Sequence, residues 1–236
     1  RPTVAGTFVA RSTGAFTLTP PAVRRGSATT DAVVTVPMQN RSVFFLWSTG
    51  SERRRAEAIT ANVQRRASMA TVGGTENRAF LGDTGGTVYR MDPDGVEATT
   101  SFSVGQAIGS SINVMLRGSM SSVSTLYATD TLFLGTNAAN NNTVRALRPA
   151  LGPSDQIWSL ALPNTADTVR SDLYLDYTRG WLLVPVVNGG GGIVGIDLSA
   201  AAGATSPPPP PAAWSSTRRG SSEGEGAKRL CTPEAF

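Results

Sequence analysis

An all-β fold, specifically a β-propeller with about five four-stranded blades of which the first is incomplete, is what the sequence predicts. A short phrase, in which a turn-forming residue is followed by alternating apolar positions, occurs four times, and an aromatic residue follows each copy. The copies that begin at Gly86, Asn142 and Gly192 lie 56 and 50 residues apart, close to the length of a propeller blade. The 25 Gly and 15 Pro suit a fold with many turns. Because such a hairpin cannot bury its apolar face alone, the copies are expected to stack.

The four copies share the same pattern of residue types although their sequences differ. They read GTFVARS (6–12), GTVYRMD (86–92), NTVRALR (142–148) and GIVGIDL (192–198), and the aromatic residues that follow them are Phe16, Phe102, Trp158 and Trp214. Two strands are expected to precede each phrase within its blade. The first copy lacks them in this sequence, so the first blade is predicted to be incomplete.

The strands of the remaining blades follow in order along the chain. Residues 32–38 and 42–48 are predicted to pair across the turn 39–41, in the long interval after the first phrase. The next blade is expected over residues 69–104, with strands at 69–74, 78–83, 87–92 and 98–104. Two more blades are predicted, with strands at 112–118, 131–136, 143–148 and 157–162, and then at 173–177, 181–187, 193–197 and 212–216. The second strand of each is a nearly continuous apolar run, which indicates a strand covered on both faces.

Residues 51–67 fit two structures equally well. Thr49 and Glu52 have the spacing of a capping box, and four apolar residues at helical spacing favour a short helix: Ala56, Ile59, Val63 and Ala67. The alternative is an outer strand that carries charge. The stretch also contains the densest basic cluster, which is usually a solvated face: Arg53, Arg54, Arg55, Arg65 and Arg66.

The C-terminal part of the sequence has a different composition. Residues 207–211 are five consecutive prolines, stiff and extended, and are expected to form a protruding loop of the last blade. The propeller is predicted to span residues 1–217. Residues 218–236 are predicted to be a polar tail or a closing strand.

Composition excludes several classes of function. The chain contains no His, so the usual general base, the Ser–His and Cys–His nucleophile pairs and the commonest zinc ligand are absent. Cys231 is the only cysteine and has no intrachain partner. The net charge is +4, but the basic residues are scattered and accompany no nucleic-acid-binding motif, so no nucleic-acid partner is expected. No apolar run approaches the roughly 20 residues that span a bilayer.

One carboxylate pair has a spacing of chemical interest. Asp92 and Asp94 resemble half of a calcium loop, but Glu97 is the only further acidic residue nearby, and the Pro-Asp-Gly sequence favours a plain type I turn. Whether Asp92 and Asp94 bind calcium stays open. The other aspartates show no spacing that specifies a catalytic pair, and the four tryptophans are expected to pack between blades. The sequence therefore predicts no catalytic, cofactor-binding or metal-binding residue, and a protein that is not an enzyme.

Two resemblances add to this interpretation. The phrase at 192–198 followed by AAWSS at 212–216 resembles the quinoprotein-type propeller repeat, over roughly residues 70–216. This resemblance implies the fold. The enzymes of that family bind pyrroloquinoline quinone with a paired-cysteine feature and a calcium ion, so a quinone-dependent dehydrogenase is an alternative function.

The second resemblance is more specific. The C-terminal propeller of type IV pilus tip adhesins is similar, in the order and sequence of its segments, to residues 77–92, 101–115 and 131–140. The positions of its conserved motifs are occupied here by residues 80–90, 105–108 and 133–136. Ala107 and Asn137 depart from that pattern. The resemblance implies an extracytoplasmic interaction or adhesion module, associated with a pilus or another surface assembly, with a protein partner. A structural accessory subunit of a larger surface or membrane complex is an alternative. Residues 207–211 and the charges at 53–55 are the expected contact regions.

Overall fold

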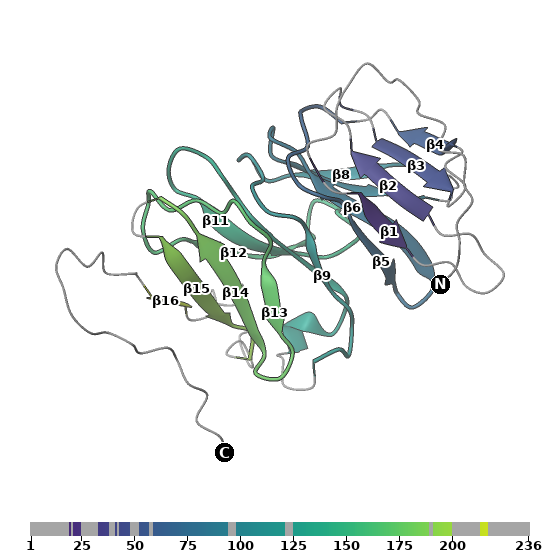
Figure 1. The fold of residues 1–236 in the computed structure, drawn as a ribbon. Coiled ribbons are helices and arrows are strands. Elements are labelled where there is room, and N and C mark those ends of the chain that lie inside the picture. The colour runs from purple at the N-terminus through teal and green to yellow at the C-terminus, as the bar shows by residue number, and fades with distance from the viewer. Residues whose placement is uncertain are drawn as a thin grey trace, which may run out of the picture.

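Four antiparallel sheets, each of four strands, make up the part of the chain that the structure describes (Figure 1). The computed structural model describes residue 19 and residues 21–24, 33–37, 41, 43–47, 52–56, 59–93, 98–120, 125–188, 191–199 and 213–216. Within these residues the chain forms no α-helix, and hence no helix with the length and apolar character of a membrane span. One 3-10 turn is present, η1 (Thr125–Tyr127).

Each sheet is a meander in which consecutive strands are hydrogen-bonded neighbours. We number the sheets as blades. Blade 1 contains β1 (Ala22–Arg24), β2 (Val33–Pro37), β3 (Val43–Trp47) and β4 (Glu52–Ala56). Blade 2 contains β5 (Ser68–Val72), β6 (Glu76–Gly82), β7 (Thr87–Met91) and β8 (Thr100–Ser103). Blade 3 contains β9 (Asn113–Met115), β10 (Thr131–Gly135), β11 (Thr143–Leu147) and β12 (Gln156–Ala161). Blade 4 contains β13 (Tyr174–Asp176), β14 (Trp181–Val186), β15 (Gly192–Asp197) and β16 (Ala213–Ser216).

The blades are arranged as in a β-propeller. The first strands of blades 1, 2 and 3 are the inner ones, since β5 lies against both β1 and β9. The sheets follow one another in chain order from blade 1 to blade 4 (Figure 1). The strands predicted at 69–104, 112–162 and 173–216, and the pair at 32–38 and 42–48, are confirmed as blades 2, 3 and 4 and as β2 and β3. The first phrase, at 6–12, lies outside the described residues, as does the proline run at 207–211.

The helix expected as one alternative for residues 51–67 is wrong. Residues 52–56 form the outer strand β4, which pairs antiparallel with β3. Charge on an outer strand opposes edge-to-edge aggregation, so the charged residues of 52–56 suit this position. The apolar residues that suggested a helical stripe are nevertheless buried: Ile59, Val63 and Ala67 lie in an extended linker and contribute to the core between blades 1 and 2.

Three apolar clusters fill the three junctions between neighbouring blades. In β6, Ala79 and Leu81 belong to the cluster shared with blade 1, whereas the alternate residue Phe80 belongs to the cluster shared with blade 3. In β10, likewise, Leu132 faces blade 2 and Phe133 faces blade 4. Each second strand of an interior blade is therefore apolar on both faces because a blade covers each face.

The linker that enters each blade makes the same backbone contact. Val63, Ile108 and Thr168 form isolated antiparallel bridges to Asp83, Thr136 and Val187, the residues that follow the second strands of blades 2, 3 and 4. Gly82 and Gly135 precede two of these positions, and a Cβ on either would lie 2.6 Å from a side-chain atom of the next linker. The glycine in the FLGD and FLGT sequences therefore allows the close approach of the following linker.

Candidate functional site

A groove of about 690 Å³ opens between blades 2 and 3, at the end of the molecule where β5 turns into β6. Three connections border it: the β5–β6 hairpin, the two ends of the long β9–β10 connection, and the turn after β11. Arg90 of β7 completes the wall. The lining residues of most interest are Val72, Glu76, Arg90, Leu116, Arg117 and Asp130.

Asp130 holds the two blades together at this groove. One carboxylate oxygen accepts a hydrogen bond from the backbone N–H of Gly73 at 2.7 Å, and the other accepts one from the backbone N–H of Arg117 at 2.5 Å. The residue is only 8% exposed. Gly73 has a φ of +60°, which a glycine adopts without strain and which the tight hairpin requires. The carboxylate thereby fixes both the β5–β6 hairpin of blade 2 and the β9–β10 connection of blade 3.

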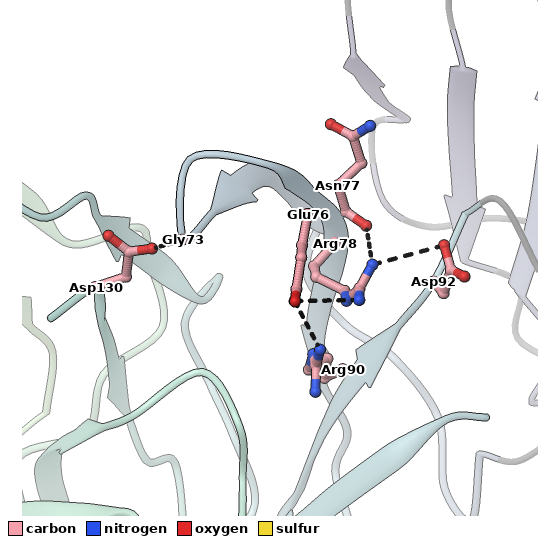
Figure 2. Close-up of polar contacts among 7 residues, drawn as sticks. All are labelled: Gly73, Glu76, Asn77, Arg78, Arg90, Asp92 and Asp130. Atoms are coloured by element: carbon pink, nitrogen blue, oxygen red, sulfur yellow. Dashed lines mark hydrogen bonds and ion pairs between the residues drawn. The ribbon is translucent and has the colours of Figure 1, made fainter. Parts of the chain in front are cut away.

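A network of charges forms the wall that blade 2 contributes. Glu76 accepts hydrogen bonds from Arg78 at 3.1 Å and from Arg90 at 3.0 Å, both on Oε2. Arg78 is buried, and its other terminal nitrogen lies 3.8 Å from Asp92 (Figure 2). Because each of these carboxylates has an arginine within ion-pair distance, the wall is held by paired charges rather than by a single flexible side chain.

The floor of the groove is apolar. Val72 is buried, whereas the side chain of Leu116 is 41% exposed, a high value for a large aliphatic residue. Pro149 and Ala150 also line the groove. Arg117 is exposed beside Leu116, and no carboxylate of the described residues forms an ion pair with it. An apolar floor inside a charged rim has the composition of a recognition site for another molecule.

A second hollow, of about 730 Å³, lies along the inner strands. It is lined mainly by β1, β5 and β9 and by the linkers that precede β5, β9 and β13. Thr71 and Leu116 border both this hollow and the groove. The groove therefore continues from the loop end of the molecule into the central space of the propeller.

The basic cluster expected to be a solvated face is only partly one. Arg65 donates from Nε to the carbonyl of Gly109 at 2.7 Å and from Nη2 to the carbonyl of Arg170, so it links the three linkers between blades. Arg66 forms an ion pair with Asp172 at 3.1 Å. These contacts make Arg65 a structural residue, because it binds backbone carbonyls that lie 44 and 105 positions away in the chain. Arg53, Arg54 and Arg55 lie in β4, and their side chains are outside what the structure describes.

The aspartates that the sequence left without a role hold local structure. Asp83 is fully buried and accepts hydrogen bonds from the backbone N–H groups of Ala61 and Thr87 and from the Tyr89 hydroxyl. Burial is the largest cause that raises the pKa of Tyr89. Asp176 accepts from the backbone N–H of Arg179, which lowers the pKa of that carboxyl. No three acidic or cysteine side chains of the described residues gather as metal ligands.

The acidic residues of the suggested calcium loop and the tryptophans are only partly within the described residues. Asp92 lies at the end of β7 beside Arg78, whereas Asp94 and Glu97 lie outside the described residues. The expectation that tryptophans pack between blades holds for Trp158, which is buried and donates from Nε1 to the Tyr127 hydroxyl at 2.9 Å.

The groove itself was not predicted from the sequence. Its only signal was the length of the β9–β10 connection, residues 116–130, compared with residues 73–75 in blade 2.

Comparison with known proteins supports the fold. No protein-family model matches the chain, and no curated protein does. Among solved structures, the chain is similar to BamB from Moraxella catarrhalis, with a TM-score of 0.55 and 12% identity over 77% of this chain and 47% of that one. It is also similar to the Dos1 propeller, with a TM-score of 0.54 and 10% identity over 79% of this chain and 44% of that one. The chain thus spans less than half the length of each. At these identities the similarity shows the β-propeller fold alone.

Proposed function

We propose that this chain is a protein-interaction module whose groove between blades 2 and 3 binds an extended segment of a partner protein. The observation that carries the proposal is the composition of the groove, an apolar floor with an exposed leucine inside a rim of fixed charges. Propellers present such sites on connections that a rigid stack of sheets holds in place. A groove of about 690 Å³ has room for a few residues of a single extended chain rather than for a folded domain.

The geometry of the rim indicates how a partner segment would be oriented. Asp130 and Glu76 already accept hydrogen bonds from the chain itself, so their charges are largely used within the fold. Arg117 is exposed, and among the described residues its guanidinium forms no ion pair, although its backbone N–H donates to Asp130. An apolar side chain of the partner on Leu116, followed by a carboxylate near Arg117, would therefore satisfy the site.

We further propose that the module acts outside the cytoplasm, in a pilus-associated or other surface assembly. The resemblance of residues 80–90, 105–108 and 133–136 to type IV pilus tip adhesins supports this. In the structure these segments come together at the junction between blades 2 and 3, where Phe80, Ile108 and Leu134 share one apolar cluster. A structural accessory subunit of a surface complex would use the same groove to hold its neighbour. No feature of the described residues favours the quinone-dependent dehydrogenase.

Selection from a displayed library of random linear peptides tests the proposed site. The strongest binders are synthesised, and their Kd values are measured for the unchanged chain and for three variants. Leu116→Asp and Arg117→Glu are each expected to raise Kd roughly tenfold or more, because they remove the floor and the unpaired cation. Tyr177→Asp, which changes an exposed aromatic residue of blade 4 outside both hollows, serves as the control. Peptides that bind the Leu116→Asp chain as tightly as the unchanged chain would contradict the proposal.

A further inference from the structure

The hollow along the inner strands is bordered by strand edges rather than by strand faces. Its lining includes the consecutive residues 68–71 of β5 and the consecutive residues 111–114, which lead into β9. Successive side chains of a strand point to opposite faces of its sheet. A hollow that touches each residue in turn therefore runs along the edge of the strand, where the backbone N–H and C=O groups point outwards.

The edge of β9 toward the hollow is open to a further strand. On one side β9 pairs antiparallel with β10, and within the described residues no strand pairs with its other side. The carbonyl of Ile112, just before β9, accepts a hydrogen bond from Ser68 Oγ, so the backbone at this end faces β5. An unpaired edge presents a row of donors and acceptors to any extended chain that approaches it.

This edge is continuous with the groove. Leu116 follows β9 directly and borders both the groove and the hollow. Thr71 at the end of β5 borders both as well. An extended segment that rests on Leu116 can therefore follow β9 from the groove into the hollow.

The far end of the hollow favours an uncharged occupant that forms hydrogen bonds. Ser111 is only 6% exposed, and its Oγ forms no hydrogen bond within the part of the chain that the structure describes. Most buried hydroxyl groups have a hydrogen-bond partner. Arg66 and Asp172 are the charged residues in the described lining, and they form an ion pair with each other at 3.1 Å. The described lining thus offers hydrogen-bonding groups without an unpaired charge.

We propose that the partner segment bound in the groove continues into the hollow and adds to the free edge of β9 as a β-strand, through an uncharged stretch of its sequence. This rests on the proposed function, because the groove is the entrance. In strand addition, main-chain hydrogen bonds supply affinity. Only every second residue of the added stretch bonds to β9, because the N–H and C=O groups of the residues between them point away. About four residues of an extended segment match residues 113–116, at about 3.3 Å each.

Peptides selected on the unchanged chain test the added strand. A selected binder is compared with versions shortened from either end, of which the shortest keeps only the residues whose binding depends on Leu116. The full peptide is expected to bind roughly tenfold more tightly than the shortest one. N-methylation of single backbone amides in the additional residues should raise Kd roughly five- to tenfold at every second position and little at the positions between. A lysine or a glutamate within that stretch should also weaken binding, because no unpaired charge of the described lining would meet it.

A variant at the far end of the hollow tests the same strand from the side of the protein. Ser111→Ala should raise the Kd of the full peptide roughly fivefold and leave that of the shortest peptide unchanged. Ser159→Ala makes the same change on the outer strand of blade 3, at an exposed position, and should affect neither peptide. If Ser111→Ala fails to fold, the N-methylated peptides still decide, since they leave the protein unchanged.

The results that would overturn the added strand differ from those that would overturn the groove. Equal Kd values for the full and the shortest peptide, or N-methylation effects without alternation, would show that the segment does not enter the hollow. A photoreactive phenylalanine analogue at position 114 that links to this chain's own residues, and not to the bound peptide, would show the same. In each case Leu116→Asp would still weaken binding. If Leu116→Asp left even the shortest peptides unaffected, the proposed function itself would fail, and the added strand with it.

Discussion

The junction between blades 3 and 4 is filled with aromatic side chains, whereas the junction between blades 2 and 3 ends in an open groove. In the first, the ring of Phe133 lies 6.1 Å from that of Tyr127 and 6.0 Å from that of Trp158. In the second, Phe80 is the only fully buried aromatic residue among the described members of the cluster, and its neighbours are mostly aliphatic. Two junctions with the same strand order therefore differ in how their loop ends are closed.

One connection produces both outcomes. Met120 and Tyr127 of the β9–β10 connection pack into the core between blades 3 and 4. Its two ends, at Leu116 and Asp130, border the groove between blades 2 and 3. A long connection in a repeated fold can therefore complete one junction and leave a groove at the next.

The largest loss in the free energy of unfolding, and a difference between the two junctions, is expected when the central aromatic residue of each junction is replaced by alanine. Phe133→Ala should destabilise the fold by about 3–5 kcal/mol, the usual cost of a large core truncation. Phe80→Ala should cost about 1 kcal/mol less, because Phe80 has no aromatic pair to lose. Denaturant unfolding measures both. Equal losses, or a larger loss at Phe80, would remove the distinction between the two junctions.

Alkaline pH should destabilise the aromatic junction but not the junction that carries the groove. Burial raises the pKa of Tyr127 from 10.0 to about 12. Because the unfolded chain loses this proton first, the stabilisation is complete below pH 10 and is lost as the pH rises through 12, about 2–3 kcal/mol in all. The Tyr127→Phe chain is expected to lose less stability over that range, and an identical alkaline loss in that chain would show that other groups cause it.

The two junctions should respond alike where their geometry is alike. Gly82→Ala and Gly135→Ala each place a methyl group 2.6 Å from a side-chain atom of the following linker. Both are expected to cost about 1–3 kcal/mol through overpacking. Thermal unfolding of the two variants provides the measurement. If one change is tolerated and the other is severe, the linkers do not hold the two junctions in the same way.

Removal of the link across the groove should have a moderate effect. Asp130→Ala leaves the backbone N–H groups of Gly73 and Arg117 without their acceptor, but water can reach the open groove. We therefore expect a loss of about 1–2 kcal/mol. Amide hydrogen exchange should accelerate in the β5–β6 hairpin and at the start of the β9–β10 connection. Unchanged exchange at Gly73 would mean that Asp130 does not hold the hairpin.

The smallest expected effect on stability is at the proposed binding residue. Leu116→Asp changes an exposed side chain and should alter the free energy of unfolding by less than about 0.5 kcal/mol. Binding of a selected peptide should nevertheless be lost. A large loss of stability in this variant would assign Leu116 to the core of the fold and would remove the basis for the groove as a recognition site.

The blades could be predicted from the sequence because the apolar positions of the repeated phrase and of the alternating strands are the positions that become buried. Phe80, Phe133 and Trp158 were all in predicted strands, and each is buried between blades. Residues 51–67 were ambiguous because an extended linker that buries Ile59, Val63 and Ala67 at intervals of four has the same spacing as a helical stripe. The role of Arg65 was not predictable, since its acceptors are backbone carbonyls of distant linkers.

The groove could not be predicted for a different reason. Its residues come from three connections, and neither Leu116 nor Asp130 stands in a motif. The length of residues 116–130 indicated only that this connection must pack somewhere. Where it packs depends on the side chains of Met120 and Tyr127, which fit the core of one junction rather than the other.

Site-specific photocrosslinking in cells of the source organism tests the central claim most directly. A photoreactive phenylalanine analogue at position 116 would lie on the floor of the groove, and the same group at position 177 would lie on an exposed turn of blade 4. We predict that the chain labelled at 116 forms a covalent adduct with one partner protein, identified by mass spectrometry through a single extended segment, and that the chain labelled at 177 does not. Equal adducts from both positions, or none from 116 while the protein is assembled with its partner, would contradict the groove as the binding site.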